Sequence, residues 1–172
     1  MLTKTRWMAA AAMVLFAVPQ AAQAMTFDCD VPADRTSSVQ LNFTAAPLIQ
    51  GIITAHEFRR AQFNPVAGIR VQSPDDSASA LLQLAELPED PGKLTLLVTI
   101  SSGVEMSRRK VALVEINGQI PFSLRITPEG AVLGEVAGQT FNANVGALNN
   151  GLINMFCSSG QFKFSNVTIS AN

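Results

Sequence analysis

The stretch PFSLRITPEGAVLGEVAGQTF, residues 121–141, carries the clearest structural signal in this chain. From Ile120 to Ile126 every second residue is apolar, and the residues between them are mostly polar. Because successive side chains of a β-strand point to opposite faces, this period of two indicates a strand with one buried face. Residues 127–130, Thr-Pro-Glu-Gly, then place proline and glycine where a β-turn favours them, so a second strand is expected to follow.

Alternation of the same kind recurs along the chain and predicts further strands. Residues 39–44 and 94–101 each place apolar side chains on one parity and mostly polar ones on the other. Turn residues separate such runs at 91–92 (Pro-Gly), 101–103 (Ser-Ser-Gly) and 149–151 (Asn-Asn-Gly). Many short strands at this spacing predict an all-β fold, a two-sheet antiparallel β-sandwich or a barrel.

Asn117-Gly118 is the strongest hairpin signal in the chain. It lies between the strand-like residues 110–116 and 119–126. An Asn-Gly pair favours a type I′ turn, in which both central residues have positive φ. The sequence therefore predicts that these two segments pair with each other as a hairpin.

Two other segments are harder to interpret. Residues 78–87 are rich in alanine and leucine and follow N-cap candidates at 75–77, which favours a helix, whereas the surrounding pattern favours a strand; both stay open. Near the C-terminus, residues 158–160 (Ser-Ser-Gly) predict a turn. The apolar parity changes at residues 165–166, which predicts a β-bulge or a change of buried face.

The N-terminus has the pattern of an export signal. Lys4 and Arg6 precede an apolar run over residues 7–18, and residues 22–24 (Ala-Gln-Ala) fit a cleavage site. We expect residues 1–24 to be a secretory signal peptide and residues 25–172 to form a single domain, exported to the periplasm or the extracellular space. The exported chain is mildly acidic and has no basic stripe, so nucleic acid is not an expected partner, nor is an integral membrane span expected in it.

Cys29 and Cys157 are the only cysteines, and they lie near opposite ends of the exported chain. In an oxidising compartment two cysteines most simply pair, although two unpaired buried thiols are the alternative. A disulfide requires the two Cα atoms to lie within about 7 Å of each other. The pairing therefore predicts that the first and last segments of the domain lie side by side.

Two stretches carry a resemblance to a known superfamily: residues 121–141, quoted above, and GLINMFCSSGQFKFSNVTIS, residues 151–170. They resemble the last half of concanavalin A-like jelly rolls, the lectin, glucanase and laminin-G-like sandwiches, whose final strand has the form Phe-x-Asn-Val-x-Ile. Here that element is residues 164–169. The resemblance covers about residues 110 to 170, points to no specific family, and implies that the first and last strands are neighbours.

No catalytic constellation is recognisable. The glucanase branch of that superfamily uses carboxylates spaced Glu-x-Asp-x-x-Glu on one strand, and no such run exists here. Glu86, Glu89 and Asp90 fall in a proline-bounded loop, where solvated turn residues are expected. His56 is the sole histidine and is expected at a strand edge or on the surface. We therefore expect that the protein is not an enzyme, with no catalytic or cofactor-binding residue and no cofactor.

Calcium is the metal most compatible with the fold that the resemblance implies. Loops that contain Asp75, Asp76, Asp90, Asn149 or Asn150 could supply oxygen ligands, but no ligand spacing identifies a site, so no metal-binding residue is predicted.

The aromatic composition argues partly against a sugar-binding site. The chain has no tyrosine, and its one tryptophan, Trp7, lies in the predicted signal. The alternation of apolar and polar residues assigns four phenylalanines to buried faces of strands: Phe43, Phe122, Phe162 and Phe164.

Two short basic clusters, at residues 59–60 and 108–110, could contact a polyanion or lipid headgroups, or could be solvated strand ends that discourage edge pairing.

These observations favour a non-catalytic exported β-sandwich module that binds or supports an envelope component, with carbohydrate as the first candidate. The alternative is a structural subunit of a pilus-like or matrix assembly. Pilin-type subunits usually hold a shorter cysteine loop and an incomplete sheet, so the long loop predicted here argues against that alternative.

Overall fold

The computed structural model describes residues 24–116 and 118–171, and all the regular structure in that part of the chain is β-strand. The predicted signal peptide of residues 1–24 falls almost wholly outside the described residues and stays a prediction. The strands are β1 (Met25–Phe43), β2 (Pro47–Phe58), β3 (Val66–Gln72), β4 (Ala78–Ala85), β5 (Lys93–Ser102), β6 (Glu105–Glu115), β7 (Gln119–Ile126), β8 (Ala131–Val136), β9 (Gln139–Asn144) and β10 (Gly151–Ala171).

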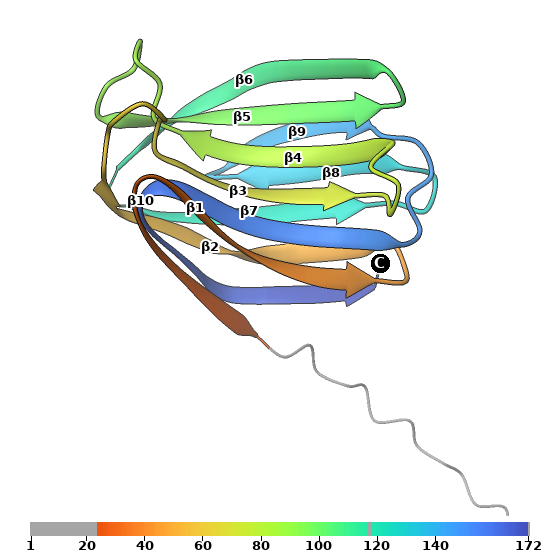
Figure 1. Ribbon diagram of the computed structural model, residues 1–172. Coiled ribbons are helices and arrows are strands. Elements are labelled where there is room, and N and C mark those ends of the chain that lie inside the picture. The colour runs from red at the N-terminus through yellow and green to blue at the C-terminus, as the bar shows by residue number, and fades with distance from the viewer. Residues whose placement is uncertain (1–23, 117, 172) are drawn as a thin grey trace, which may run out of the picture.

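The strands form two antiparallel layers that share β1 and β10 (Figure 1). The first sheet contains β6, β5, β4 and β3, followed by the early part of β10, which pairs with β3 over residues 152–158. The second sheet contains the later part of β10, which pairs with β2 from Gly160 onward, followed by β7, β8 and β9. β1 pairs with β10 along almost its whole length. The chain therefore forms the predicted two-sheet antiparallel sandwich, a jelly roll.

β1 and β10 pass from one sheet to the other at a shared bend. The β1–β10 register shifts between Val31 and Thr36, and Asp34 and Ser159 have φ of 60° and 52°. The backbone N–H of Asp34 donates to Oγ of Ser159 at 3.0 Å, which ties the two bends together. The prediction of a turn at residues 158–160 was therefore wrong in one respect: the chain bends there within a continuous strand and does not reverse.

The predicted bulge at residues 165–166 is confirmed. The β10–β2 register shifts between Ser165 and Thr168, and Asn166 has a φ of 52°. Because one residue is added to β10 there, Phe164 and Val167 both point inward although their numbers differ in parity.

The hairpin predicted at Asn117-Gly118 is wrong. β6 pairs with β5, whereas β7 pairs with β2 on one side and β8 on the other, so the chain crosses between the sheets here. Beside β2, the apolar face of β7 is buried against the first sheet, and this burial outweighs the local turn preference. The turn at residues 127–130 is confirmed, with the N–H of Gly130 donating to the carbonyl of Thr127 at 2.8 Å between β7 and β8.

The segment left open between helix and strand is β4, which ends at Ala85. Ala80, Leu82 and Leu84 face the interior in a period of two, so pairing with β3 and β5 overrides the helical propensity.

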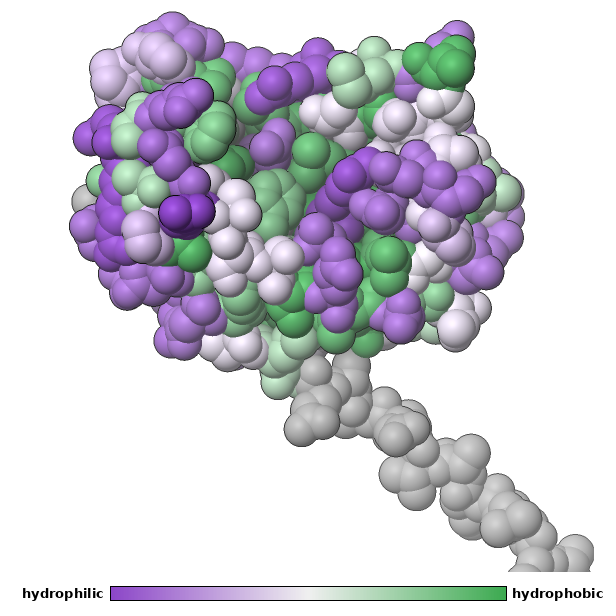
Figure 2. Space-filling model, viewed as in Figure 1, coloured by the Kyte–Doolittle hydropathy of each residue, from purple (hydrophilic) through white to green (hydrophobic). Residues whose placement is uncertain are grey.

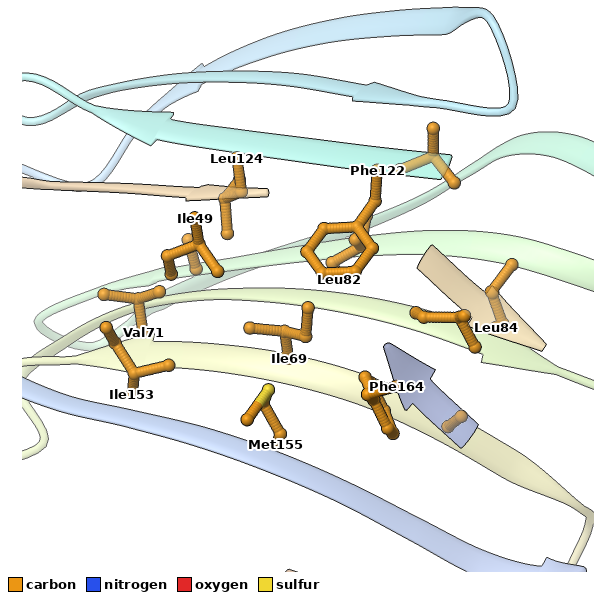
Figure 3. Close-up of a cluster of buried hydrophobic side chains, with 14 of the residues drawn as sticks. Ile49, Ile69, Val71, Leu82, Leu84, Phe122, Leu124, Ile153, Met155 and Phe164 are labelled. Atoms are coloured by element: carbon orange, nitrogen blue, oxygen red, sulfur yellow. The ribbon is translucent and has the colours of Figure 1, made fainter. Parts of the chain in front are cut away.

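The core lies between the two inner faces and draws apolar side chains from both sheets (Figure 3). The phenylalanines expected on buried parities, Phe43, Phe122, Phe162 and Phe164, are all buried. Cys29 and Cys157 form the predicted disulfide, with their Cα atoms 6.1 Å apart, and both are buried. Within the described residues there is no helix long and apolar enough to cross a membrane.

Candidate functional site

The outer face of the first sheet presents two cross-strand rows of side chains, one strand after another. Strand register places the first row across β1, β10, β3, β4, β5 and β6 as Gln40, Asn154, Arg70, Leu81, Thr99 and Arg108. The neighbouring row, in the same strand order, is Ser38, Phe156, Gly68, Gln83, Leu97 and Lys110. We refer to these twelve residues as the outer face. Figure 2 looks onto it and shows apolar residues across its middle with polar residues on both sides.

Phe156 lies flat at the centre of the outer face because its neighbour on β3 is a glycine. A Cβ added to Gly68 would lie 2.7 Å from the ring carbon Cζ of Phe156 and 2.7 Å from the carbonyl oxygen of Leu82. Only the absence of a side chain at position 68 lets the ring settle over the backbone. Phe156 is half-buried, so part of the ring remains open to a ligand.

Next to Phe156 along β10, Asn154 has an unsatisfied polar atom. Its Oδ1 is buried and has no hydrogen-bond partner among the described residues. Buried polar atoms are paired in most proteins, so an unpaired one needs an explanation. The amide of Asn154 is therefore a polar group of the outer face whose hydrogen bonding the described residues leave incomplete.

Two cationic side chains of the outer face, Arg70 and Lys110, are each paired with an aspartate. Arg70 donates to Oδ1 of Asp76 at 2.6 Å and to Oγ of Ser79 at 3.4 Å, which holds its guanidinium beside the β3–β4 loop. Nζ of Lys110 donates to Oδ2 of Asp90 at 2.5 Å. This hydrogen bond is the main reason why the pKa of Asp90 lies below its ordinary value.

The carboxylates considered for catalysis do not gather. The expectation that Glu86 is a solvated turn residue is wrong: it is 4% exposed, accepts hydrogen bonds from the guanidinium of Arg60 and accepts one from the N–H of Gly92 at 2.8 Å. Burial alone would raise the pKa of Glu86, but the hydrogen bonds from Arg60 and Gly92 and the charge of Arg60 outweigh it and lower the pKa. Glu86 therefore closes the 86–92 loop onto the 59–65 loop. Glu89 and His56 are exposed.

The loop carboxylates considered for calcium are used within the protein. Asp75 accepts hydrogen bonds from Oγ of Ser73 at 2.6 Å and of Ser77 at 2.8 Å, and these lower the pKa of Asp75 to about 2. Asp76 pairs with Arg70, and Asn149 and Asn150 are exposed before β10. No group of three or more His, Cys, Asp or Glu residues in the described chain could hold a metal ion.

The cluster at residues 59–60 is structural. Arg59 pairs with Asp30 at 2.5 Å and with Glu57 at 2.7 Å, and it also donates to the carbonyl of Val31 at 2.9 Å. Arg60 pairs with Glu86. The Arg60 side chain is nevertheless 60% exposed just after the end of β2, so the expectation of a solvated strand end is wrong only for Arg59.

A depression of about 540 Å³ lies at the far end of the second sheet. Its residues come from β7, β8 and β9, together with Arg109 from β6: Arg109, Ser123, Arg125, Leu133, Gly134, Glu135, Thr140, Phe141 and Asn142. Arg109 donates to the backbone carbonyl of Asn142 at 3.1 Å and so bridges the end strands of the two sheets.

Sequence reasoning placed the buried phenylalanines correctly but did not consider Phe156. The signal was present, because Phe156 has the parity opposite to Met155 and Cys157 and so had to face outward.

Solved structures share this fold at low sequence identity. The CBM66 carbohydrate-binding module from Bacillus subtilis is 10% identical with a TM-score of 0.54, and the match covers 87% of this chain and 92% of that one. The alginate lyase A1-II′, a member of polysaccharide lyase family 7, is 12% identical with a TM-score of 0.57 over 86% of this chain and 79% of the enzyme. The agglutinin CG-16 from chicken liver is 12% identical with a TM-score of 0.54 over 79% of this chain and 100% of that one.

These neighbours confirm the concanavalin A-like jelly roll and, at such identities, show the fold alone. No protein-family model matches the sequence, and no curated protein matches it.

The prediction that the protein is not an enzyme is contradicted, since an alginate lyase is built on the same fold. The missing Glu-x-Asp-x-x-Glu run excludes only one of the chemistries that this sandwich carries. At 12% identity the likeness assigns no reaction to this chain.

Proposed function

We propose that the protein binds carbohydrate on the outer face of the first sheet, with Phe156 as the platform for a sugar ring. The observation that carries the proposal is the ring of Phe156, which lies over Gly68 and is partly exposed to solvent among polar side chains. A flat apolar surface bordered by hydrogen-bonding groups complements a sugar, whose ring has apolar C–H faces and a rim of hydroxyls.

The side chains around Phe156 suit hydroxyl recognition. Gln40, Gln83 and Asn154 carry amides, each of which both donates and accepts, as a sugar hydroxyl also does. Thr99 adds a hydroxyl group in the same row as Asn154. A ligand hydroxyl that paired the amide of Asn154 would remove the cost of its unsatisfied oxygen.

Two structural neighbours, a carbohydrate-binding module and an agglutinin, support the same proposal by analogy of fold. The disulfide supports the further proposal that the protein works outside the cytoplasm, in the periplasm or the extracellular space, since such bonds persist in oxidising compartments. Export and the choice between these two compartments stay proposals, and the assembly-subunit alternative stays an untested prediction.

A glycan array followed by titration calorimetry on the best neutral oligosaccharide tests the site. Phe156→Ala should weaken binding at least about tenfold, equivalent to 1.4 kcal/mol, because the platform is lost. Phe63→Ala is the matched control: Phe63 is 53% exposed in the 59–65 loop, outside both rows, and its loss should leave affinity within about twofold. Wild-type affinity in the Phe156→Ala protein, with its fold intact, would move the site off this face.

A further inference from the structure

The two sheets leave a seam where their end strands face each other. β6 ends the first sheet and β9 ends the second, and Arg109 spans the gap between them through its bond to the carbonyl of Asn142. The 540 Å³ depression lies at this seam. A second depression of about 150 Å³ shares Arg109 and Asn142 with it. A third, of about 400 Å³, shares Ile100 and Ser107 with the second. Because each depression shares lining residues with the next, we refer to the three together as the groove.

The widest part of the groove combines apolar and hydroxyl-bearing side chains. Strand register aligns Arg125 with Leu133 and Leu133 with Asn142 on adjacent strands, and Leu133 is 46% exposed. The next row aligns Ser123, Glu135 and Thr140 in the same way. The hydroxyls of Ser123 and Thr140 therefore lie beside an apolar surface, a combination suited to a sugar.

The guanidinium groups of this groove lack the acidic partners that three other arginines have. Arg59, Arg60 and Arg70 each form an ion pair with a carboxylate. Among the described residues, by contrast, no carboxylate pairs with Arg109 or Arg125, although both line the 540 Å³ depression. Glu135 is the one acidic side chain in its lining, so the depression carries an excess of positive charge.

We propose that this groove is a second carbohydrate site, selective for acidic sugars, in which Arg109 and Arg125 bind the carboxylate of a uronic acid residue. A guanidinium offers N–H donors in a planar fork that matches a carboxylate, and such charge-assisted bonds are stronger than neutral ones. The size of the groove favours an oligosaccharide over a small free anion. The proposal extends the carbohydrate binding proposed above to a separate site and does not involve Phe156.

The sharpest test compares an oligogalacturonate with its fully methyl-esterified form by titration calorimetry, because the two share a sugar backbone and differ only in whether each carboxyl group is ionised or esterified. The wild-type protein should bind the acid at least about tenfold more tightly than the ester. Arg125→Gln should remove most of that preference. Arg109→Lys keeps the charge but loses the planar fork, so it should reduce the preference in part without opening the seam.

Arg35→Gln is the matched control, since Arg35 is exposed at the bend of β1, away from the seam, and its loss should leave the preference unchanged. Equal affinity for acid and ester would overturn the second site while leaving the first intact. An equal loss of the preference for the acid in Arg35→Gln and Arg125→Gln would also overturn the second site, because binding would then follow the net charge of the protein. If millimolar inorganic phosphate bound the protein as strongly as the oligogalacturonate does, the groove would be an unselective anion site, and the proposal would likewise be overturned.

The Phe156→Ala protein separates the two proposals. It should lose affinity for a neutral oligosaccharide yet keep the preference for the acid over its ester. If the wild-type protein bound neither neutral nor acidic sugars, both proposals would fail together.

Discussion

Phe141 and Phe156 make the same local contact on opposite faces of the sandwich. Each ring lies over a glycine on the neighbouring strand: a Cβ added to Gly134 would lie 2.0 Å from Cζ of Phe141, and one added to Gly68 would lie 2.7 Å from Cζ of Phe156. Phe141 belongs to the inner face and is 7% exposed, whereas Phe156 belongs to the outer face and is only half-buried. One ring completes the core, and the other is left for a ligand.

The comparison extends to polar groups. On the inner side and at the loop end of the sandwich, interactions are satisfied within the protein: the disulfide joins Cys29 to Cys157, and Glu86 is paired with Arg60. On the outer face and at the seam, Asn154 keeps an unpaired oxygen and Arg125 has no carboxylate partner among the described residues. We infer that the first set of groups serves stability and the second serves binding.

Removing the disulfide should produce the largest loss of stability. The bond closes a loop across a sequence separation of 128 residues, and the chain-entropy estimate for such a loop is roughly 4.5–5 kcal/mol. Cys157→Ser should therefore unfold at a much lower temperature than the oxidised wild type and close to the reduced wild type, as followed by circular dichroism.

Below its melting temperature the same variant should keep its affinity for sugar, since the disulfide lies among buried inner residues and the proposed sites lie outside. A folded Cys157→Ser protein that no longer bound sugar would break the separation between inner and outer faces. An unchanged melting temperature on reduction would show that the bond contributes little.

Truncation of the two phenylalanines should separate stability from binding. Phe141→Ala leaves a cavity in the core and should cost about 3–4 kcal/mol in denaturant unfolding. Phe156→Ala removes a partly solvated ring and should cost about 1 kcal/mol or less. Affinity for a neutral oligosaccharide, which the outer face is proposed to bind, should show the reverse order, with the larger loss in Phe156→Ala. Equal stability losses for the two variants would mean that Phe156 is a core residue and not a platform.

Much of the difference between the inner and outer faces could be predicted from the sequence, because a period of two identifies both faces of a strand. It correctly placed Phe122, Phe162 and Phe164 inside, and the same alternation, although it was not applied to Phe156, directs that ring outward. The spacing of the two cysteines likewise predicted that the first and last strands are neighbours, as the pairing of β1 with β10 confirms.

The seam could not be predicted, because it depends on strand order. Local turn chemistry at Asn117-Gly118 favoured a hairpin between β6 and β7. Instead β7 pairs with β2, where its apolar face is buried, and β6 is left as the end strand of the first sheet. Only that order brings Arg109 to β9. Glu86 was missed for a similar reason: the prolines around it indicate a loop, but not that the loop folds back over Arg60.

The Glu86–Arg60 pair should give the smallest effect and a defined pH dependence. Because the pKa of Glu86 is lowered in the folded protein, its ionised form contributes stability that is fully present above its ordinary value of 4.5 and is lost as pH falls below it. Glu86→Gln removes the ion pair but keeps an acceptor for the N–H of Gly92, so it should cost about 1–2 kcal/mol at pH 7. Urea unfolding at pH 7 and at pH 3.5 should show that the difference in unfolding free energy between wild type and variant shrinks at the lower pH.

Glu89→Gln, an exposed change in the same loop, should show no such convergence. A constant difference across this range would mean that Glu86 acts through packing and not through its charge. Sugar affinity should be unaffected in either variant, since neither Glu86 nor Glu89 belongs to either proposed site.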